Sequence, residues 1–146
     1  MKVLFAAAAA VLLAAPVHAQ TRTIEVGFAG LMDASNRTDL EPITLTAGRM
    51  ESPGEYRLLA GGYYRIDITA DGTQEIAVAG PELFRNVWIN EVVINDIEVR
   101  PLGLDSLEFD DAGTATLTFV AIQPGRYELR IAGTTGETQR AVFVIE

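Results

Sequence analysis

Acidic residues form the densest group of chemically capable side chains in this sequence, between positions 105 and 111. Carboxylate oxygens close to a turn can hold calcium, which takes about six to eight oxygen ligands. The spacing lacks the Asp-x-Asp-x-Asp-Gly loop of dedicated calcium sites, and acidic turn residues are commonly solvated without a metal. We therefore predict no assigned metal site and keep as candidate ligands Asp105, Glu108, Asp110 and Asp111, with Asp96 and Glu98 upstream.

Two other chemistries also have candidate residues. The thioethers of Met32 and Met50 could hold Cu(I), although two isolated methionines are more typical of packing. A carboxylate pair could hydrolyse a glycosidic bond, but 20 Asp and Glu make some pair inevitable in a chain this short. Residues 20–146 contain no histidine, so a general base near neutral pH would have to be a perturbed carboxylate. We predict that the chain is not an enzyme and carries no cofactor.

Aromatic side chains offer a candidate interaction surface, and the candidate residues are Tyr56, Tyr63, Tyr64, Phe84 and Trp88. Tyr63 should point away from the face of Tyr64, hence outward, because neighbouring residues of a strand face opposite sides. Together with Trp88 it could form a platform for a sugar or a protein. The alternative, which we favour for Trp88, is a place in the core.

The first 19 residues read as a leader. Lys2 precedes an unbroken apolar run at residues 3–15, and Val17 and Ala19 place small residues at the positions that flank a cleavage site. The run is shorter than the roughly 20 residues that cross a bilayer. We expect a cleaved secretory signal peptide, an exported domain at residues 20–146, and no stable membrane anchor.

Cleavage at this position would remove Lys2 and His18, which are the only lysine and histidine. Ten arginines would then face 20 acidic residues, and the chain has no cysteine. This composition excludes a Ser-His-Asp triad, a cysteine nucleophile, the usual zinc sites, a blue-copper centre and a disulfide. The negative charge also argues against a nucleic-acid partner, because phosphate binding needs clustered basic residues.

Apolar residues alternate with polar ones along most of the chain, which predicts strands and no long helix. Turn residues such as Asp71-Gly72 and Pro124-Gly125 separate the segments. We expect about eight strands in an all-β antiparallel sandwich or barrel, near residues 23–28, 64–69, 76–78, 87–89, 97–99, 107–109, 115–119, 127–131 and 141–145. Residues 29–54 should be mostly loop with one strand at 43–46, and residues 81–86 should form a single helical turn. The predicted core is Tyr64, Ile66, Ile68, Ile76, Val78, Leu117, Phe119, Tyr127, Leu129, Phe143 and Ile145.

Four motifs follow one another in residues 58–146: Leu59-Ala60-Gly61-Gly62-Tyr63-Tyr64-Arg65-Ile66, Asp71-Gly72, Pro81-Glu82-Leu83-Phe84, and Phe119 followed by Pro124-Gly125-Arg126-Tyr127-Glu128-Leu129-Arg130. Together they resemble the bacterial periplasmic cupredoxin-like proteins. The resemblance implies a Greek-key β-sandwich of the cupredoxin type and a location in the periplasm. Its most specific piece is the phenylalanine followed after four residues by Pro-Gly-x-Tyr.

In copper-carrying members of that family, a cysteine ends the strand after this motif, and a loop then brings a histidine and usually a methionine. The corresponding positions are about Ile131, residues 133–136 and Gln139, and an earlier histidine would fall near Glu75 or Ile76. None of these positions matches. Because a type 1 site needs a thiolate and two imidazoles, the resemblance implies the fold without the copper.

Taken together, these observations predict an exported, non-enzymatic binding or accessory module that works through an unknown protein or envelope component. The alternative function is metal handling, either of calcium through carboxylates or of copper through methionines.

Overall fold

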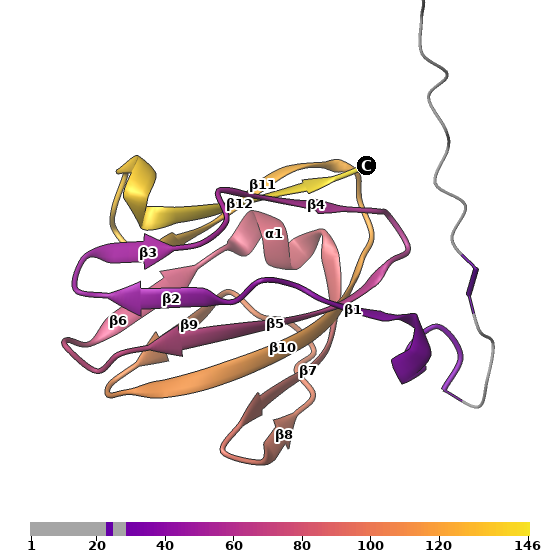
Figure 1. The fold of residues 1–146 in the computed structure, drawn as a ribbon, viewed down its shortest axis with the longest axis horizontal. Coiled ribbons are helices and arrows are strands. Elements are labelled where there is room, and N and C mark those ends of the chain that lie inside the picture. The colour runs from indigo at the N-terminus through magenta and orange to yellow at the C-terminus, as the bar shows by residue number, and fades with distance from the viewer. Residues whose placement is uncertain (1–22, 25–28) are drawn as a thin grey trace, which may run out of the picture.

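The computed structural model describes residues 23–24 and 29–146. The predicted leader and most of the predicted strand at 23–28 lie outside the described residues. Two β-sheets pack face to face around one apolar core (Figure 1). This arrangement confirms the predicted all-β sandwich.

The larger sheet has seven strands. Along the sheet, the path runs β3-β2-β5-β10-β7-β8, and β1 pairs with the first half of β5. Its strands are β1 (Arg37–Asp39), β2 (Ile43–Thr46), β3 (Arg49–Glu51), β5 (Tyr63–Ala70), β7 (Val87–Ile94), β8 (Ile97–Val99) and β10 (Gly113–Ala121). At one edge β8 is held only by the end of β7, so the β7–β8 hairpin projects from the sandwich (Figure 1).

The smaller sheet has five strands in the order β4-β12-β11-β6-β9. These are β4 (Glu55–Leu58), β6 (Ile76–Ala79), β9 (Ser106–Phe109), β11 (Gly125–Ile131) and β12 (Arg140–Ile145). The chain changes sheet several times, so neighbouring strands within a sheet are often distant in sequence.

Within the part of the chain that the structure describes, helical structure is confined to three short pieces. The predicted turn after β6 is confirmed as α1 (Pro81–Arg85). It begins with proline, which lacks an N–H, in the first turn, where a backbone N–H has no partner within the helix. The other two pieces are the 3₁₀ turns η1 (Ala34–Asn36) and η2 (Glu137–Gln139). No helix among the described residues is long and apolar enough to cross a membrane.

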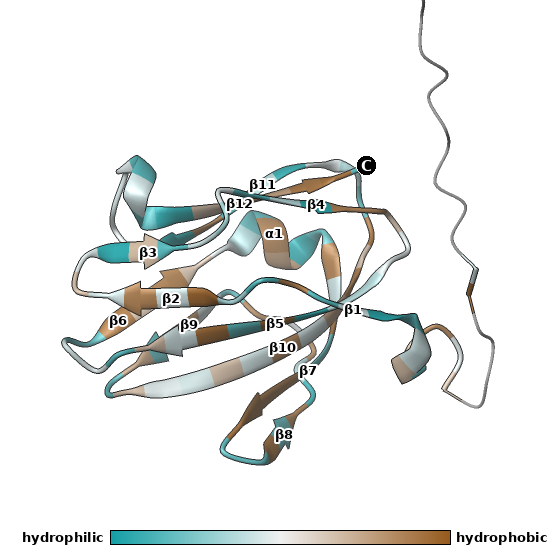
Figure 2. Ribbon diagram, in the orientation of Figure 1, coloured by the Kyte–Doolittle hydropathy of each residue, from teal (hydrophilic) through white to brown (hydrophobic). Residues whose placement is uncertain are grey.

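The core confirms most of the sequence prediction. Ten of the eleven predicted core residues are buried, and Tyr127 is only partly buried against the cluster. Figure 2 shows the apolar segments concentrated on the strands, where alternate residues face inward. Tyr56 on β4 and Phe143 on β12 form a further buried pair. Their rings stack with centroids 4.7 Å apart.

Two expectations about the strands are wrong. The sandwich is not purely antiparallel, because β1 and β2 run parallel to β5, and β4 runs parallel to β12. In the segment at 29–54 the strand expected at 43–46 is confirmed as β2, but the rest is not all loop, since it also contains η1, β1 and β3. β1 and β3 are only three residues long, too short for an alternating pattern to stand out.

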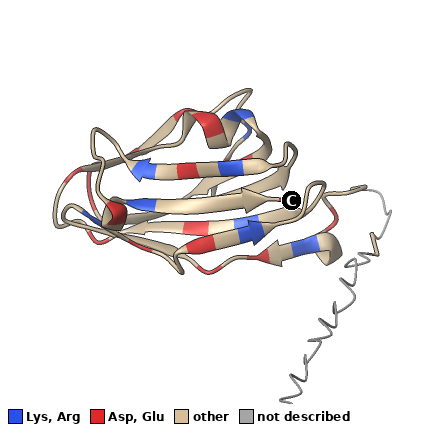
Figure 3. Ribbon diagram, turned by 90° about the horizontal axis from the view of Figure 1, so that it is seen from above, with Lys and Arg blue, Asp and Glu red and all other residues tan. Residues whose placement is uncertain are grey.

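The outer face of the smaller sheet carries paired charges. Arg126, Glu128 and Arg130 share this face, as the alternation predicts, and Figure 3 shows basic and acidic positions side by side on it. Arg126 reaches Glu55 on β4, while Glu128 accepts from both Arg130 and Arg140. The two arginines hold the pKa of the Glu128 carboxyl below its usual value. These contacts account for the charges without a ligand.

Candidate functional site

The positions implied for copper ligands lie at one end of the smaller sheet. The Ala132 N–H donates to the Ala77 carbonyl, which places the loop after β11 beside the start of β6. Ile131 is buried, and the amide of Gln139 is engaged at both ends, donating to the Gly48 carbonyl and accepting from the Gly136 N–H. An aliphatic side chain and an engaged amide offer neither thiolate nor imidazole, so these residues do not fit a type 1 copper ion.

Three carboxylates converge beside this end. Oxygens of Glu75, Glu108 and Asp110 all lie within 4.8 Å of one another, and all three side chains are exposed. Pairing of β6 with β9 brings them together, because Ile76 lies opposite Phe109. The hydrogen bond that the protonated Glu108 carboxyl donates to Glu75, together with the negative charge of Glu75, raises the pKa of Glu108. The group could take a divalent cation through its oxygens.

The structure therefore joins only part of the acidic stretch singled out from sequence. Glu108 and Asp110 meet. Asp105 precedes Glu108 by three residues, or about 10 Å along the strand, and its carbonyl accepts from the Gly80 N–H. Asp111 caps its own turn by accepting from the Ala112 N–H. Glu75 was missed because it is distant in sequence and joins the group only through strand pairing.

The two methionines occupy different ends of the larger sheet. Met50 is buried in the core on β3, which pairs with β2 beside the Ala70 end of β5. Met32 precedes η1 and β1, and β1 pairs with the Tyr63 end of the same strand. The structure thus gives no shared thioether site to this pair.

A group of exposed apolar side chains stands on the β7–β8 hairpin and the loop that follows it. Seven large hydrophobic residues are exposed in the described part of the chain, and five of them fall within this short stretch. We call them the β7–β8 apolar surface: Trp88, Ile94, Ile97, Val99 and Leu102. It has two sides, because strand register places Trp88 on the outer face of the sheet and Ile94, Ile97 and Val99 on the face that the core residue Val92 shares. Single exposed apolar residues are ordinary, but a local concentration is typical of an interaction site.

Trp88 is 48% exposed, so the prediction that favoured a core position is wrong. Its neighbours Val87 and Ile89 face the core, and alternation turns Trp88 to the opposite side. On that outer side no second sheet covers it, and β8 pairs only with the far end of β7. The indole therefore stands at the surface.

Tyr63 is the reverse case. It lies on the outer face, as predicted, but is only 4% exposed, so the expectation that it is open to solvent is wrong. Strand register places Tyr63, Val120 and Trp88 in one row across three strands. Asn90, the extra residue of a β-bulge in β7, donates to the Tyr63 hydroxyl at 3.3 Å and to Thr118 Oγ1 at 3.0 Å. Of the five aromatic residues considered, only Trp88 remains exposed.

A groove of about 300 Å³ opens next to the indole. Its lining includes Phe84 of α1, Trp88 of β7, and Pro101, Leu102 and Gly103 of the loop after β8. Arg100 ties the loop to the strand, since its guanidinium donates to the Asn90 carbonyl and pairs with Glu91 and Glu98. The groove has aromatic and aliphatic walls and one arginine whose charge is already balanced.

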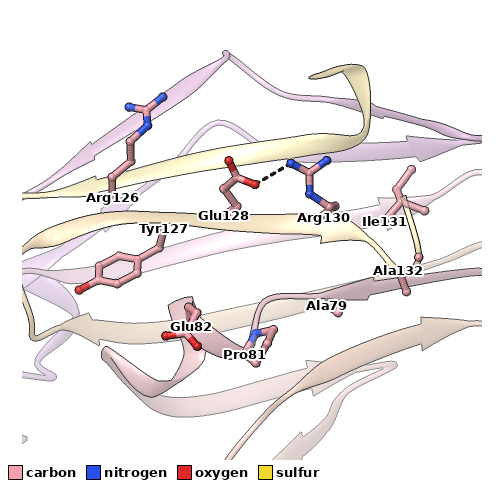
Figure 4. Close-up of a pocket in the computed structure, with 10 residues that line it drawn as sticks. Ala79, Pro81, Glu82, Arg126, Tyr127, Glu128, Arg130, Ile131 and Ala132 are labelled. Carbon is pink, nitrogen blue, oxygen red and sulfur yellow. Dashed lines mark hydrogen bonds and ion pairs between the residues drawn. The ribbon is translucent and has the colours of Figure 1, made fainter. Parts of the chain in front are cut away.

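A second cavity, of about 470 Å³, lies between β11 and the start of α1. Figure 4 shows Glu128 and Arg130 paired on the β11 side, with Tyr127 nearby and Pro81 and Glu82 across the opening. The Tyr127 hydroxyl donates to the Gln123 carbonyl at 3.0 Å. The polar groups of this groove are bonded to the protein itself, which leaves no nucleophile and base in contact.

Comparison with solved structures identifies the fold. The chain superposes on a multicopper oxidase (TM-score 0.53, 8% identity, 80% of this chain and 46% of the other). It is also similar to a multicopper oxidase from Pseudomonas thermotolerans (0.57, 14%, 78% and 31%) and to the copper nitrite reductase of Nitrosomonas europaea (0.51, 15%, 66% and 33%).

The sequence itself matches no protein-family model and no curated protein. The chain spans between about a third and about half of the structures it resembles, so their activities belong to larger molecules. At 8–15% identity the likeness concerns the backbone alone. The described chain has the cupredoxin-like β-sandwich fold that copper oxidases and nitrite reductases share.

Proposed function

We propose that this protein is an exported, non-enzymatic binding or accessory module of the cupredoxin-like type, without a type 1 copper centre. The observation that carries the proposal is the contrast between two regions. The end of the sandwich where the fold's copper ligands are expected holds Ile131 and Gln139, which cannot supply them. The β7–β8 apolar surface, by contrast, is open to solvent.

The absence of an assembled catalytic group supports a non-enzymatic role. Catalysis by nucleophile or general base needs such groups in contact with a substrate space. Around the cavity between β11 and α1, Arg126 pairs with Glu55, Arg130 pairs with Glu128, and the Tyr127 hydroxyl is bonded to backbone. The carboxylates of Glu75, Glu108 and Asp110 are exposed to solvent.

A protein is the partner that best suits the Trp88 groove. Half-exposed tryptophan beside aliphatic walls is typical of the anchoring residues of protein interfaces. Arg100 is balanced by two glutamates, so the groove presents little net charge to attract an ion. We infer that an apolar side chain of an envelope or periplasmic protein occupies it.

Copper uptake tests the metal-free part of this proposal. We expect the purified protein, dialysed against Cu(I) and Cu(II), to retain no stoichiometric copper and to show no visible thiolate-to-copper absorption. One bound copper with such a band would overturn the proposal. The thioether alternative is tested by Met32→Leu, which should leave any residual copper unchanged because Met50 is buried on another part of the sheet.

Site-specific photocrosslinking in the producing cell tests the partner. A photoreactive aromatic residue at Trp88 should give one discrete protein adduct that Leu102→Asp removes. The matched control is the same residue at Glu51, which lies on the exposed edge strand β3. Equal adducts from both positions, or none from position 88, would contradict a binding site at the groove.

Calcium binding is the second candidate, favoured by the convergence of Glu75, Glu108 and Asp110 within 4.8 Å. Calorimetry with calcium should then show heat that Glu75→Gln combined with Glu108→Gln removes. Asp105→Asn is the matched control, because Asp105 lies at the other end of β9 and should leave the heat unchanged. No heat with the unmodified protein would exclude this candidate.

A further inference from the structure

The strand β8 is a free edge with an unusual surface. It ends the strand order of the larger sheet, so no strand of residues 29–146 pairs with one side of its backbone. Ile97 is 66% exposed and Val99 46%, and both lie on the same face as Ile94, which is opposite Ile97 in the hairpin. An open edge with exposed apolar side chains is a template for pairing with another strand.

The hairpin turn fixes which backbone groups of β8 face outward. Asn95 and Asp96 have φ of 49° and 65°, which makes a two-residue turn of type I′. The residues that flank such a turn, Ile94 and Ile97, exchange backbone hydrogen bonds, and the pattern then alternates along the strands. The N–H and carbonyl of Glu98 therefore point away from β7, and those of the next alternate residue, Arg100, continue the same side.

The outward backbone groups of Glu98 and Arg100 can pair with those of a second copy when the two Val99 residues lie opposite each other. When two copies of this segment run antiparallel with Val99 opposite Val99, Glu98 of each copy lies opposite Arg100 of the other and can exchange backbone hydrogen bonds with it. Opposite charges directly across a strand pair are favourable. Pro101 lacks an N–H, but it belongs to the inward-facing set and loses nothing. Centring on Glu98 instead would set two glutamates against each other.

We propose that β8 is a homodimerisation edge, at which two copies of this chain pair antiparallel about Val99. The pairing joins the two larger sheets into one and covers Ile97 and Val99 of both copies. The occupant is a second copy because the charge order Glu98, Val99, Arg100 complements itself under a twofold rotation. Arg100 also lines the Trp88 groove, but the pairing is between two copies of the purified chain and needs no other partner, so the dimer does not depend on the function proposed above.

The opposite edge of the same sheet provides an internal comparison. β3 also carries an arginine and a glutamate on either side of an apolar residue, Arg49, Met50 and Glu51, and its charges are exposed. Met50, however, is buried in the core and offers no apolar surface to a second copy. Both edges therefore place opposite charges on either side of an apolar residue, and the exposed apolar area distinguishes β8.

Charge reversal tests the pairing through sedimentation equilibrium. Because only a few side chains are covered, we expect a weak dimer visible between about 10 µM and 1 mM. Glu98→Arg and Arg100→Glu should each raise the dissociation constant about tenfold, and the double variant should recover most of the association. Glu51→Arg on β3 is the matched control and should leave it unchanged. A protein that is monomeric at about 1 mM, or that responds equally to Glu51→Arg, overturns the proposal.

Cysteine crosslinking tests the register separately. The chain has no cysteine, so each introduced thiol is the only one present. Val99→Cys lies on the twofold axis at a pair without hydrogen bonds, where side chains approach most closely, and should form a covalent dimer under mild oxidation. Ile97→Cys should do so at least tenfold more slowly, because its counterpart is then across Pro101. Equal rates for the two variants would overturn the register.

Discussion

The stack of Tyr56 on Phe143 should make a measurable energetic coupling between β4 and β12. The two rings are 4% and 1% exposed, and their centroids lie 4.7 Å apart at an interplanar angle of 17°. Replacing either ring by leucine keeps the site apolar but removes the ring contact, and should lower the free energy of unfolding by about 1–3 kcal/mol. Tyr56→Leu also removes the hydrogen bond to the Glu41 carbonyl.

Urea unfolding followed by far-ultraviolet circular dichroism measures both single variants and the double variant. The double variant should be less destabilised than the sum of the singles by about 0.5–1.5 kcal/mol, the usual worth of an aromatic pair beyond its buried area. The control cycle combines Tyr56→Leu with Phe119→Leu, whose ring pairs with Tyr64 instead, and should be additive within about 0.5 kcal/mol. Additivity in the first cycle, or equal coupling in both, would refute the stacked geometry.

Three other predictions concern single positions. Glu128→Gln should lower the free energy of unfolding at neutral pH by up to about 1 kcal/mol. Since the folded-state pKa of Glu128 is lowered, this difference should vanish as the pH falls below about 4, where the unfolded and then the folded carboxyl take up protons; an unchanged difference would contradict the ion pairs. Gly80→Ala should cost about 1 kcal/mol in thermal unfolding, because the added Cβ would lie 3.0 Å from Leu129 Cδ1, whereas Gly103→Ala, with open space around it, should change stability by under about 0.5 kcal/mol. Trp88 is the single tryptophan and is half-exposed, so its fluorescence should be red-shifted and readily quenched by acrylamide in the native state; a blue-shifted, protected emission would place it in the core.

Sequence alone predicted those parts of the fold in which alternation runs over several residues. Ile66 and Ile68 on β5, and Leu117 on β10, lie where alternation places them, because each of these strands is long enough to repeat the pattern. Parallel pairing of β4 with β12 left no trace in the pattern, since alternation specifies which face is buried and not which strand is adjacent.

The candidate site was harder to predict. The alternation of Val87 with Ile89 already pointed Trp88 outward, but the general tendency of tryptophan to be buried argued for the core, and the local signal was the better guide. The sequence predicts that Tyr63 lies on the outer face of its sheet, but it does not predict that the side chain is buried there. That burial depends on neighbours such as Asn90, whose position is set by a β-bulge. Glu75 meets Glu108 only through the pairing of two short strands, which no spacing along the chain could indicate.

The position of β12 bears on the order in which the molecule can assemble. This strand follows all the others in the described chain, yet it lies between β4 and β11 in the interior of the smaller sheet. Until Phe143 and Ile145 are in place, β4 has no neighbouring strand and Tyr56 has no ring to stack on. β4 therefore gains its partner only when β12 docks, and that pairing joins segments nearly 90 residues apart, a long-range contact that favours slow folding.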